Sequence, residues 1–98
     1  MIKGISDYEE SIIKNILKVY PYQFYYYGSR VKGDFTKASD LDILIKSENE
    51  IPISIMEEIT LKFNESKIPY IVNLSDFNKM DKDFYKLIES NLVEILYS

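Results

Sequence analysis

Apolar residues near the start of the chain recur at the spacing of one helix face. They are Ile12, Ile13, Ile16, Leu17 and Tyr20. This pattern predicts an amphipathic helix over about 7–20, which Pro21 would end. Ser6 and Glu9 have the spacing of a capping box at its start. The next segment, QFYYY at 23–27, is apolar or aromatic at most positions and predicts a central strand with both faces buried.

A second strand is predicted over 41–45, where successive side chains alternate between two faces. One face is aliphatic and carries Leu41, Ile43 and Ile45. The other face carries two carboxylates, Asp40 and Asp42. A buried aliphatic face opposite an acidic one suggests that this strand both builds the core and presents polar groups for chemistry.

Similar patterns in the rest of the chain predict a helix over 53–66, a strand over 68–74 and a helix over 81–90. Segment 92–97 is apolar enough to close the fold as either a helix or a strand. The alternation of helices and strands predicts an α/β or α+β fold with a small mixed sheet of three to four strands flanked by helices. At 98 residues, the chain is expected to form a single domain over 1–98.

Composition limits the chemistry that the chain can perform. The net charge of −4 and the pI near 4.8 argue against direct binding of nucleic acid, but permit a basic protein partner or a metal-bridged nucleotide. Cysteine and histidine are absent, so thiolate zinc sites and a histidine base are excluded. The longest uncharged stretch, 19–29, is too short to span a membrane. A cytoplasmic protein without membrane association is therefore expected.

A Gly-Ser pair stands where the first predicted strand turns into a short helix. Gly28 allows the unusual backbone that such a turn needs, and the start of a helix offers N–H groups to a phosphate. The Ser29 hydroxyl adds a donor, and Arg30 could contact a phosphate with two N–H groups or could instead be structural. Lys32 and Lys37 flank this segment and are expected to be mainly solvated. The pair alone is an ordinary strand-end turn, so its meaning depends on what lies beside it.

Asp40 and Asp42 lie two residues apart and point to one face of their strand. Two carboxylates at this spacing suit Mg²⁺, which binds through one or two carboxylates together with substrate phosphates. If the first two strands are neighbours, the Gly28-Ser29 turn and the acidic pair meet at the same sheet edge. Phosphoryl or nucleotidyl transfer requires that arrangement.

The segment YYYGSRVKGDFTKASDLDILIK resembles the motif of the minimal nucleotidyltransferases, in which a Gly-Ser pair precedes an Asp-x-Asp pair. Gly33 and Ser39 match further positions of that motif, and the resemblance covers about residues 8–97. It implies the nucleotidyltransferase fold and an antitoxin of a toxin–antitoxin pair. Such an enzyme uses ATP and Mg²⁺ to transfer AMP to a tyrosine of a HEPN-type toxin. It also implies catalytic roles for Asp40 and Asp42, which would hold the metal, and nucleotide binding by Gly28, Ser29 and Arg30.

The family has a third carboxylate on its third strand, and this chain has Asn73 at the matching position. An amide can offer a carbonyl oxygen to a metal but cannot act as a general base. Asp76 is an odd number of residues away and should face the other side of the strand. Three hypotheses follow: a protein adenylyltransferase weakened at Asn73, a catalytically degenerate binding module that neutralises or regulates its partner, and a subunit of a larger nucleotidyltransferase complex.

The chain also has nine tyrosines, more than one small core needs, and aromatic residues are common at interfaces. Some of Tyr8, Tyr22, Tyr85 and Tyr97 are expected to be partly exposed and to contact a protein partner. The run at 25–27 is expected to belong mainly to the core, with base stacking as the alternative.

Overall fold

The computed structural model describes residues 4–33, 36 and 39–97. Within them the chain forms α1 (Asp7–Leu17), β1 (Gln23–Tyr27), α2 (Ser29–Lys32), β2 (Leu41–Lys46), α3 (Ile53–Asn64), β3 (Val72–Asp76), the short 3-10 turn η1 (Phe77–Lys79), α4 (Lys82–Ile88), a second 3-10 turn η2 (Glu89–Asn91) and β4 (Val93–Glu94). The predicted mixed α/β architecture is confirmed. None of the helices in the described residues is long and apolar enough to cross a bilayer.

The four strands form one sheet in the order β3-β2-β1-β4. β1 runs antiparallel to β2 and β4, whereas β2 and β3 are parallel. Across the sheet, Tyr27 pairs with Asp42 and Asp42 pairs with Asn73. Because β1 and β2 are direct neighbours, the expected meeting of the Gly28 turn with the acidic strand is observed.

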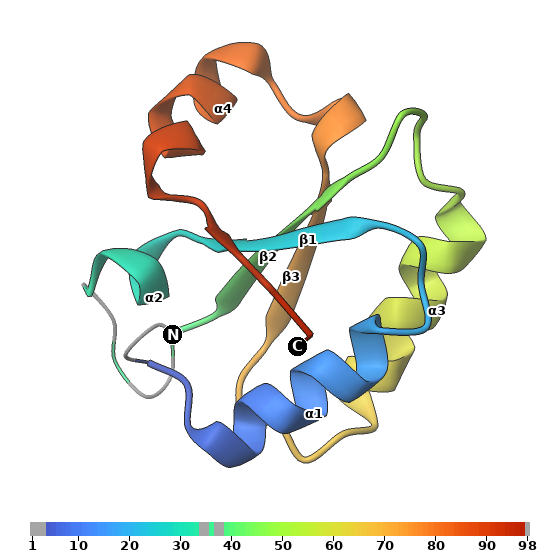
Figure 1. The fold of residues 1–98 in the computed structure, drawn as a ribbon, viewed down its shortest axis with the longest axis vertical. Helices are drawn as coiled ribbons and strands as arrows, with labels where there is room; N and C mark the ends of the chain where they lie inside the picture. Colours follow the sequence, from blue (N-terminus) through green and yellow to red (C-terminus); the bar gives the residue numbers. More distant parts are fainter. Residues whose placement is uncertain (1–3, 34–35, 37–38, 98) are drawn as a thin grey trace.

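Each face of the sheet has its own apolar cluster. The larger cluster lies under α1 and α3, and its sheet residues include Phe24, Tyr26, Leu41, Ile43 and Ile45. The smaller cluster joins Tyr27 and Leu44 to Ile88 of α4. Figure 1 shows α1 and α3 together on one side of the sheet and α4 on the other. The alternation predicted for β2 is therefore confirmed, and the acidic residues lie on the α4 face.

Helix α1 begins as predicted but ends earlier than expected. The Ser6 hydroxyl accepts a hydrogen bond from the Glu9 amide at 3.1 Å, and the Ser6 amide donates to Glu9 Oε1 at 3.2 Å, which completes the capping box. The helix ends at Leu17 and not at residue 20, because Pro21 disfavours helical backbone at the residue before it. The chain instead closes a tight turn in which the Tyr20 amide donates to the Leu17 carbonyl at 3.1 Å.

The third strand was predicted over 68–74 but is observed at Val72–Asp76. Pairing with β2 starts where the Leu41 amide donates to the carbonyl of Ile71, and Pro69 has no N–H to extend the ladder backwards. Ile68 and Tyr70 pack against the larger core cluster before the strand begins. The last helix likewise ends at Ile88, and the closing segment, left open by the sequence, contains the strand Val93–Glu94.

Candidate functional site

Gly28 forms the turn between β1 and α2 and has a backbone that other residues rarely adopt, with φ of 85° and ψ of −157°. A Cβ atom at this position would collide with the carboxylate of Asp42, whose partner across the β1–β2 pair is the preceding residue, Tyr27. The torsion angles therefore favour glycine, and any larger residue would also displace the Asp42 carboxylate. Ser29 follows it and begins α2, which is a single turn of four residues, so its helix dipole is small.

The two carboxylates of the acidic pair converge on one point, as their bonds to Asn73 show. Asn73 Nδ2 donates to Asp40 Oδ2 at 3.0 Å and lies 3.4 Å from Asp42 Oδ1. One donor atom thus lies within reach of both side chains. The amide must present its NH2 group here, because ionised carboxylates only accept hydrogen bonds.

The environment of Asp42 disfavours its charged form. Burial raises the pKa of Asp42, and the nearby charge of Asp40 raises it further, whereas the hydrogen bond from Asn73 acts in the opposite direction. Two partly desolvated carboxylates that converge repel each other, so a bound cation would stabilise their charged forms. The two carboxylates offer hard oxygen ligands that suit a divalent metal. The described residues contain no group of three acidic or histidine side chains that could hold such an ion.

Arg30 has a different position from the one expected of a phosphate ligand. Its side chain is only 2% exposed, and its Nε and Nη2 atoms donate to the Ser39 carbonyl at 3.1 and 2.8 Å. Nη1 donates to the Gly4 carbonyl, and the guanidinium lies 3.9 Å from the centre of the Tyr70 ring. These contacts of Arg30 join the N-terminal segment, the approach to β2 and the approach to β3, as the structural alternative expects, and its contact with phosphate stays a prediction.

Two polar residues of the same sheet face were not identified from the sequence. Tyr27 Oη lies 3.0 Å from Ser75 Oγ, and Ser75 is two residues after Asn73 on β3. The period of two along β3 could have placed Ser75 on the face of Asn73, had the strand been assigned its observed bounds. Burial raises the pKa of the Tyr27 hydroxyl, and the Asp42 charge raises it further, so this group stays protonated.

Asp76 has the capping role expected from the sequence and does not replace the missing carboxylate. It is 5% exposed, and its two oxygens accept hydrogen bonds from the Ile51 amide at 2.7 Å and the Asn78 amide at 2.9 Å. It therefore holds the start of η1 and the chain before α3.

Lys37, one of the two lysines that flank the Gly28 segment, lies outside the described residues.

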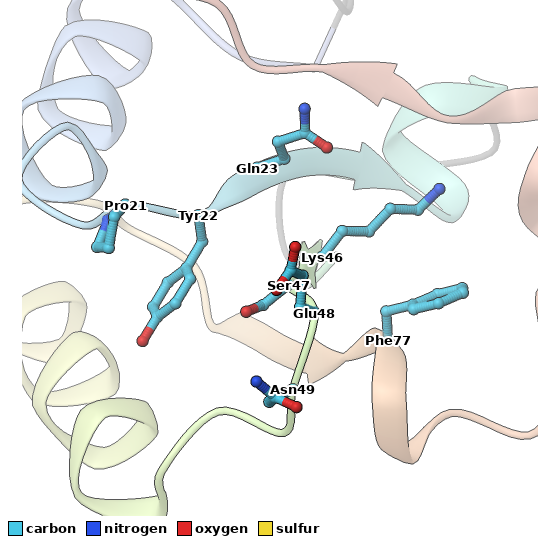
Figure 2. Close-up of a pocket in the computed structure, with 8 residues that line it drawn as sticks. All are labelled: Pro21, Tyr22, Gln23, Lys46, Ser47, Glu48, Asn49 and Phe77. Atoms are coloured by element: carbon cyan, nitrogen blue, oxygen red, sulfur yellow. The ribbon is translucent and has the colours of Figure 1, made fainter.

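A hollow of about 700 Å³ lies at the opposite end of β1 and β2. Figure 2 shows its lining, in which Tyr22 and Gln23 point in opposite directions beside Lys46 and Phe77. Gln23 pairs with Lys46 at one end of the two strands, whereas Tyr27 pairs with Asp42 at the other end. The hollow is therefore separate from the acidic pair, which lies at the other end of these two strands beside the Gly28 turn.

Comparison with known proteins gives three consistent findings. The family model "Polymerase beta, Nucleotidyltransferase" matches residues 11–98. A Haemophilus influenzae protein named "Probable protein adenylyltransferase MntA" is 37% identical over 93 residues, which cover 93% of this chain and 82% of that protein. A crystal structure of a toxin-antitoxin with AMP-PNP superimposes with a TM-score of 0.74 and 18% identity, over 91% of this chain and 73% of that one. At this identity the structural likeness concerns the fold.

Proposed function

This chain belongs to the polymerase beta nucleotidyltransferase family, and we propose that it transfers AMP from ATP to a tyrosine of a protein partner. The partner we propose is a HEPN-type toxin, which would make the chain an antitoxin. Support comes from the relative named as a protein adenylyltransferase and from the shared fold of the toxin-antitoxin structure. The observation that carries the proposal is the convergence of Asp40 and Asp42 beside the Gly28 turn.

In the proposed reaction, the tyrosine oxygen attacks the α-phosphorus of ATP and forms a new P–O bond. The bond from the α-phosphorus to the oxygen that bridges to the β-phosphate breaks, pyrophosphate leaves, and the hydroxyl proton passes to a base. Gly28 and Ser29 would contact the outgoing phosphates through the backbone and the hydroxyl. Nucleotidyltransferases generally use a divalent metal with ATP, and Mg²⁺ held by Asp40 and Asp42 would neutralise phosphate charge and orient the triphosphate.

Asn73 is the point at which we propose that the catalytic power of this chain is reduced. Its amide faces both carboxylates but has no lone pair on nitrogen that can take the proton from an attacking hydroxyl. A general base typically contributes about 10²–10⁴-fold to a rate. The proposed enzyme therefore transfers AMP slowly, with solvent as the proton acceptor.

The amide also favours a second candidate function, a degenerate module that neutralises its partner by binding alone. The two functions are separated by supplying α-labelled ATP and Mg²⁺ to the chain together with a HEPN protein encoded by a neighbouring gene. Adenylyl transfer predicts label on the HEPN protein and loss of that label with Asp42→Asn. Binding alone predicts no label and unchanged suppression of the toxin by Asp42→Asn.

A further inference from the structure

A second hollow, which we call the β3–α4 hollow, lies between the end of β3 and helix α4. It has a volume of about 310 Å³, and its lining consists of Ser75, Asp76, Lys79, Met80 and Phe84. In Figure 1 the chain leaves β3, passes through η1 and continues into α4 on the side of the sheet that carries the acidic pair. The β3–α4 hollow therefore borders the sheet face on which the proposed reaction takes place.

Ser75 and Phe84 connect this hollow to the candidate site. The Phe84 ring packs edge-on against the Tyr27 ring, with 6.3 Å between the ring centres. The hydroxyl of Tyr27 in turn lies 3.0 Å from Ser75 Oγ. Ser75 is two residues after Asn73 on β3, so their side chains share one face at a spacing of about 7 Å. The hollow thus begins about one side-chain length from the point at which the acidic pair converges.

The β3–α4 hollow and the Gly28 turn lie on opposite sides of Asp42. Asp42 pairs with Tyr27 of β1 and with Asn73 of β3. Gly28 comes directly after the first of these partners, and Ser75 comes two residues after the second. Because β1 is antiparallel to β2 and β3 is parallel to it, the turn and the hollow also lie in opposite directions along β2. A line from the turn to the hollow therefore crosses the acidic pair diagonally.

The geometry of in-line attack decides which reactant the hollow faces. This step rests on the proposed transfer of AMP, in which pyrophosphate leaves toward the Gly28 turn. The attacking oxygen approaches the α-phosphorus from the side opposite to the leaving group. That side is formed by β3 and the β3–α4 hollow, so the hollow faces the acceptor and not the outgoing phosphates.

The lining of the hollow suits a phenol ring better than a nucleobase. Met80 and Phe84 offer apolar surface, and Phe84 is 43% exposed. Ser75 is already bonded to a tyrosine hydroxyl, and both oxygens of Asp76 accept hydrogen bonds from backbone amides. Lys79 can donate but not accept. Adenine would bring both an amino donor and ring acceptors to this wall, whereas the single polar atom of a phenol is the hydroxyl that reacts.

We propose that the β3–α4 hollow binds the ring of the tyrosine that receives AMP. The ring lies against Met80 and Phe84, and its hydroxyl points back toward the acidic pair. A tyrosine side chain is long enough to cover the spacing of about 7 Å between Ser75 and Asn73. Serine or threonine at the same backbone position would be too short, so the hollow selects tyrosine as the acceptor.

Binding is tested first without catalysis, on the full chain with N-acetyltyrosinamide followed by NMR. Saturable shifts are expected for the signals of Phe84 and Ser75, and none for Phe77, which lines the separate hollow of Figure 2. N-acetylalaninamide, which has no ring, should cause no shift. Shifts centred on Phe77, no response to N-acetyltyrosinamide, or a stronger response of Phe84 to adenosine would each overturn the proposal.

Transfer kinetics then test the role of the hollow in the reaction. Phe84→Ala should raise the KM for the protein partner by roughly tenfold, because an aromatic contact with the acceptor is lost. The kcat and the binding of ATP should change little, because this contact is the same before and during transfer. Leu87→Ala is the matched control, since Leu87 is 71% exposed on the same helix but does not line the hollow. Equal KM values for the two variants, or loss of ATP binding in Phe84→Ala, would overturn the proposal, and circular dichroism checks that both variants fold.

The proposed function and the role of the hollow can fail separately. If the partner is never labelled but N-acetyltyrosinamide binds with the expected shifts, AMP transfer is contradicted and the hollow remains a site for a tyrosine of the partner. If the partner is labelled equally well by wild type and Phe84→Ala at low partner concentration, AMP transfer stands and the assigned role of the hollow is wrong.

Discussion

Gly28 lies so close to Asp42 of the neighbouring strand that a Cβ atom added at Gly28 would lie 2.3 Å from Asp42 Oδ2 and would force the carboxylate to move. The contact joins the turn proposed to hold phosphate to the strand proposed to hold metal. It also makes the geometry of the acidic pair dependent on a residue that carries no functional group. The consequences can be measured one residue at a time.

Replacing Gly28 with alanine should displace the Asp42 carboxylate and also strain the backbone, because φ is 85°. The strain should cost on the order of 1–3 kcal/mol of unfolding free energy. Gly33→Ala is the matched control, since Gly33 also has a positive φ of 90° but an added Cβ atom there would meet nothing within 4 Å. Urea unfolding should show a loss for both variants, whereas calorimetry with Mg²⁺ and ATP should show lost binding for Gly28→Ala alone. Equal binding by the two variants would contradict the proposed role of the contact.

Replacing Asp40 and Asp42 together with asparagine should leave the fold intact or stabilise it. Burial and the charge of Asp40 both raise the pKa of Asp42, so the charged pair is a cost to the free protein at neutral pH. Mg²⁺-dependent ATP binding should disappear. The control Asp7→Asn with Asp83→Asn makes the same charge change at exposed positions and should keep binding. A collapsed double variant, together with a wild-type melting temperature that Mg²⁺ never shifts, would disprove the metal site.

Restoring a carboxylate by Asn73→Asp should increase AMP transfer to the partner by roughly tenfold or more, because it supplies the missing base. ATP binding should change much less, because Gly28, Ser29 and the acidic pair are retained. Single-turnover transfer of labelled AMP compares the two proteins. Asn73→Ser serves as the control, because it also breaks the amide contacts with Asp40 and Asp42 but adds no carboxylate. If Asn73→Ser is as fast as Asn73→Asp, the gain comes from releasing the acidic pair and not from a base.

Arg30→Met should lower the unfolding free energy by roughly 1–3 kcal/mol, because the partly buried carbonyl groups of Ser39 and Gly4 lose their donor. Lys32→Met, on the exposed part of α2, should stay within about 0.5 kcal/mol of wild type. Urea unfolding measures both. A stable Arg30→Met variant that fails to bind ATP would instead restore the phosphate role expected from the sequence.

The sequence predicted those features that depend on local patterns. The bounds of β1 followed from QFYYY between Pro21 and Gly28, and the two faces of β2 followed from simple alternation. The predicted nucleotidyltransferase fold is confirmed by the matching family model. The Tyr residues expected at the surface are at least partly exposed, with Tyr8 at 60% and Tyr97 at 46%, while their contact with a partner remains a prediction.

Features that depend on long-range contacts could not be obtained in this way. The start of β3 is fixed by its pairing with β2, and the position of the Arg30 side chain depends on Tyr70, Ser39 and Gly4, which lie in three separate segments. The bond between Asn73 and Asp40 joins residues 33 positions apart. No periodicity within one segment contains this information, because each contact requires the sheet to exist.

Tyr27, Asp42 and Asn73 are aligned across three strands. This alignment depends on the number of residues in each strand more than on their identity. Loss of one residue within 23–27 would shift the register of β1 by one position. Residues such as Tyr26 would then move from the larger core cluster to the acidic face, and Tyr27 would move in the opposite direction. We therefore expect relatives to accept insertions and deletions in the connections between strands, and to tolerate only substitutions within them.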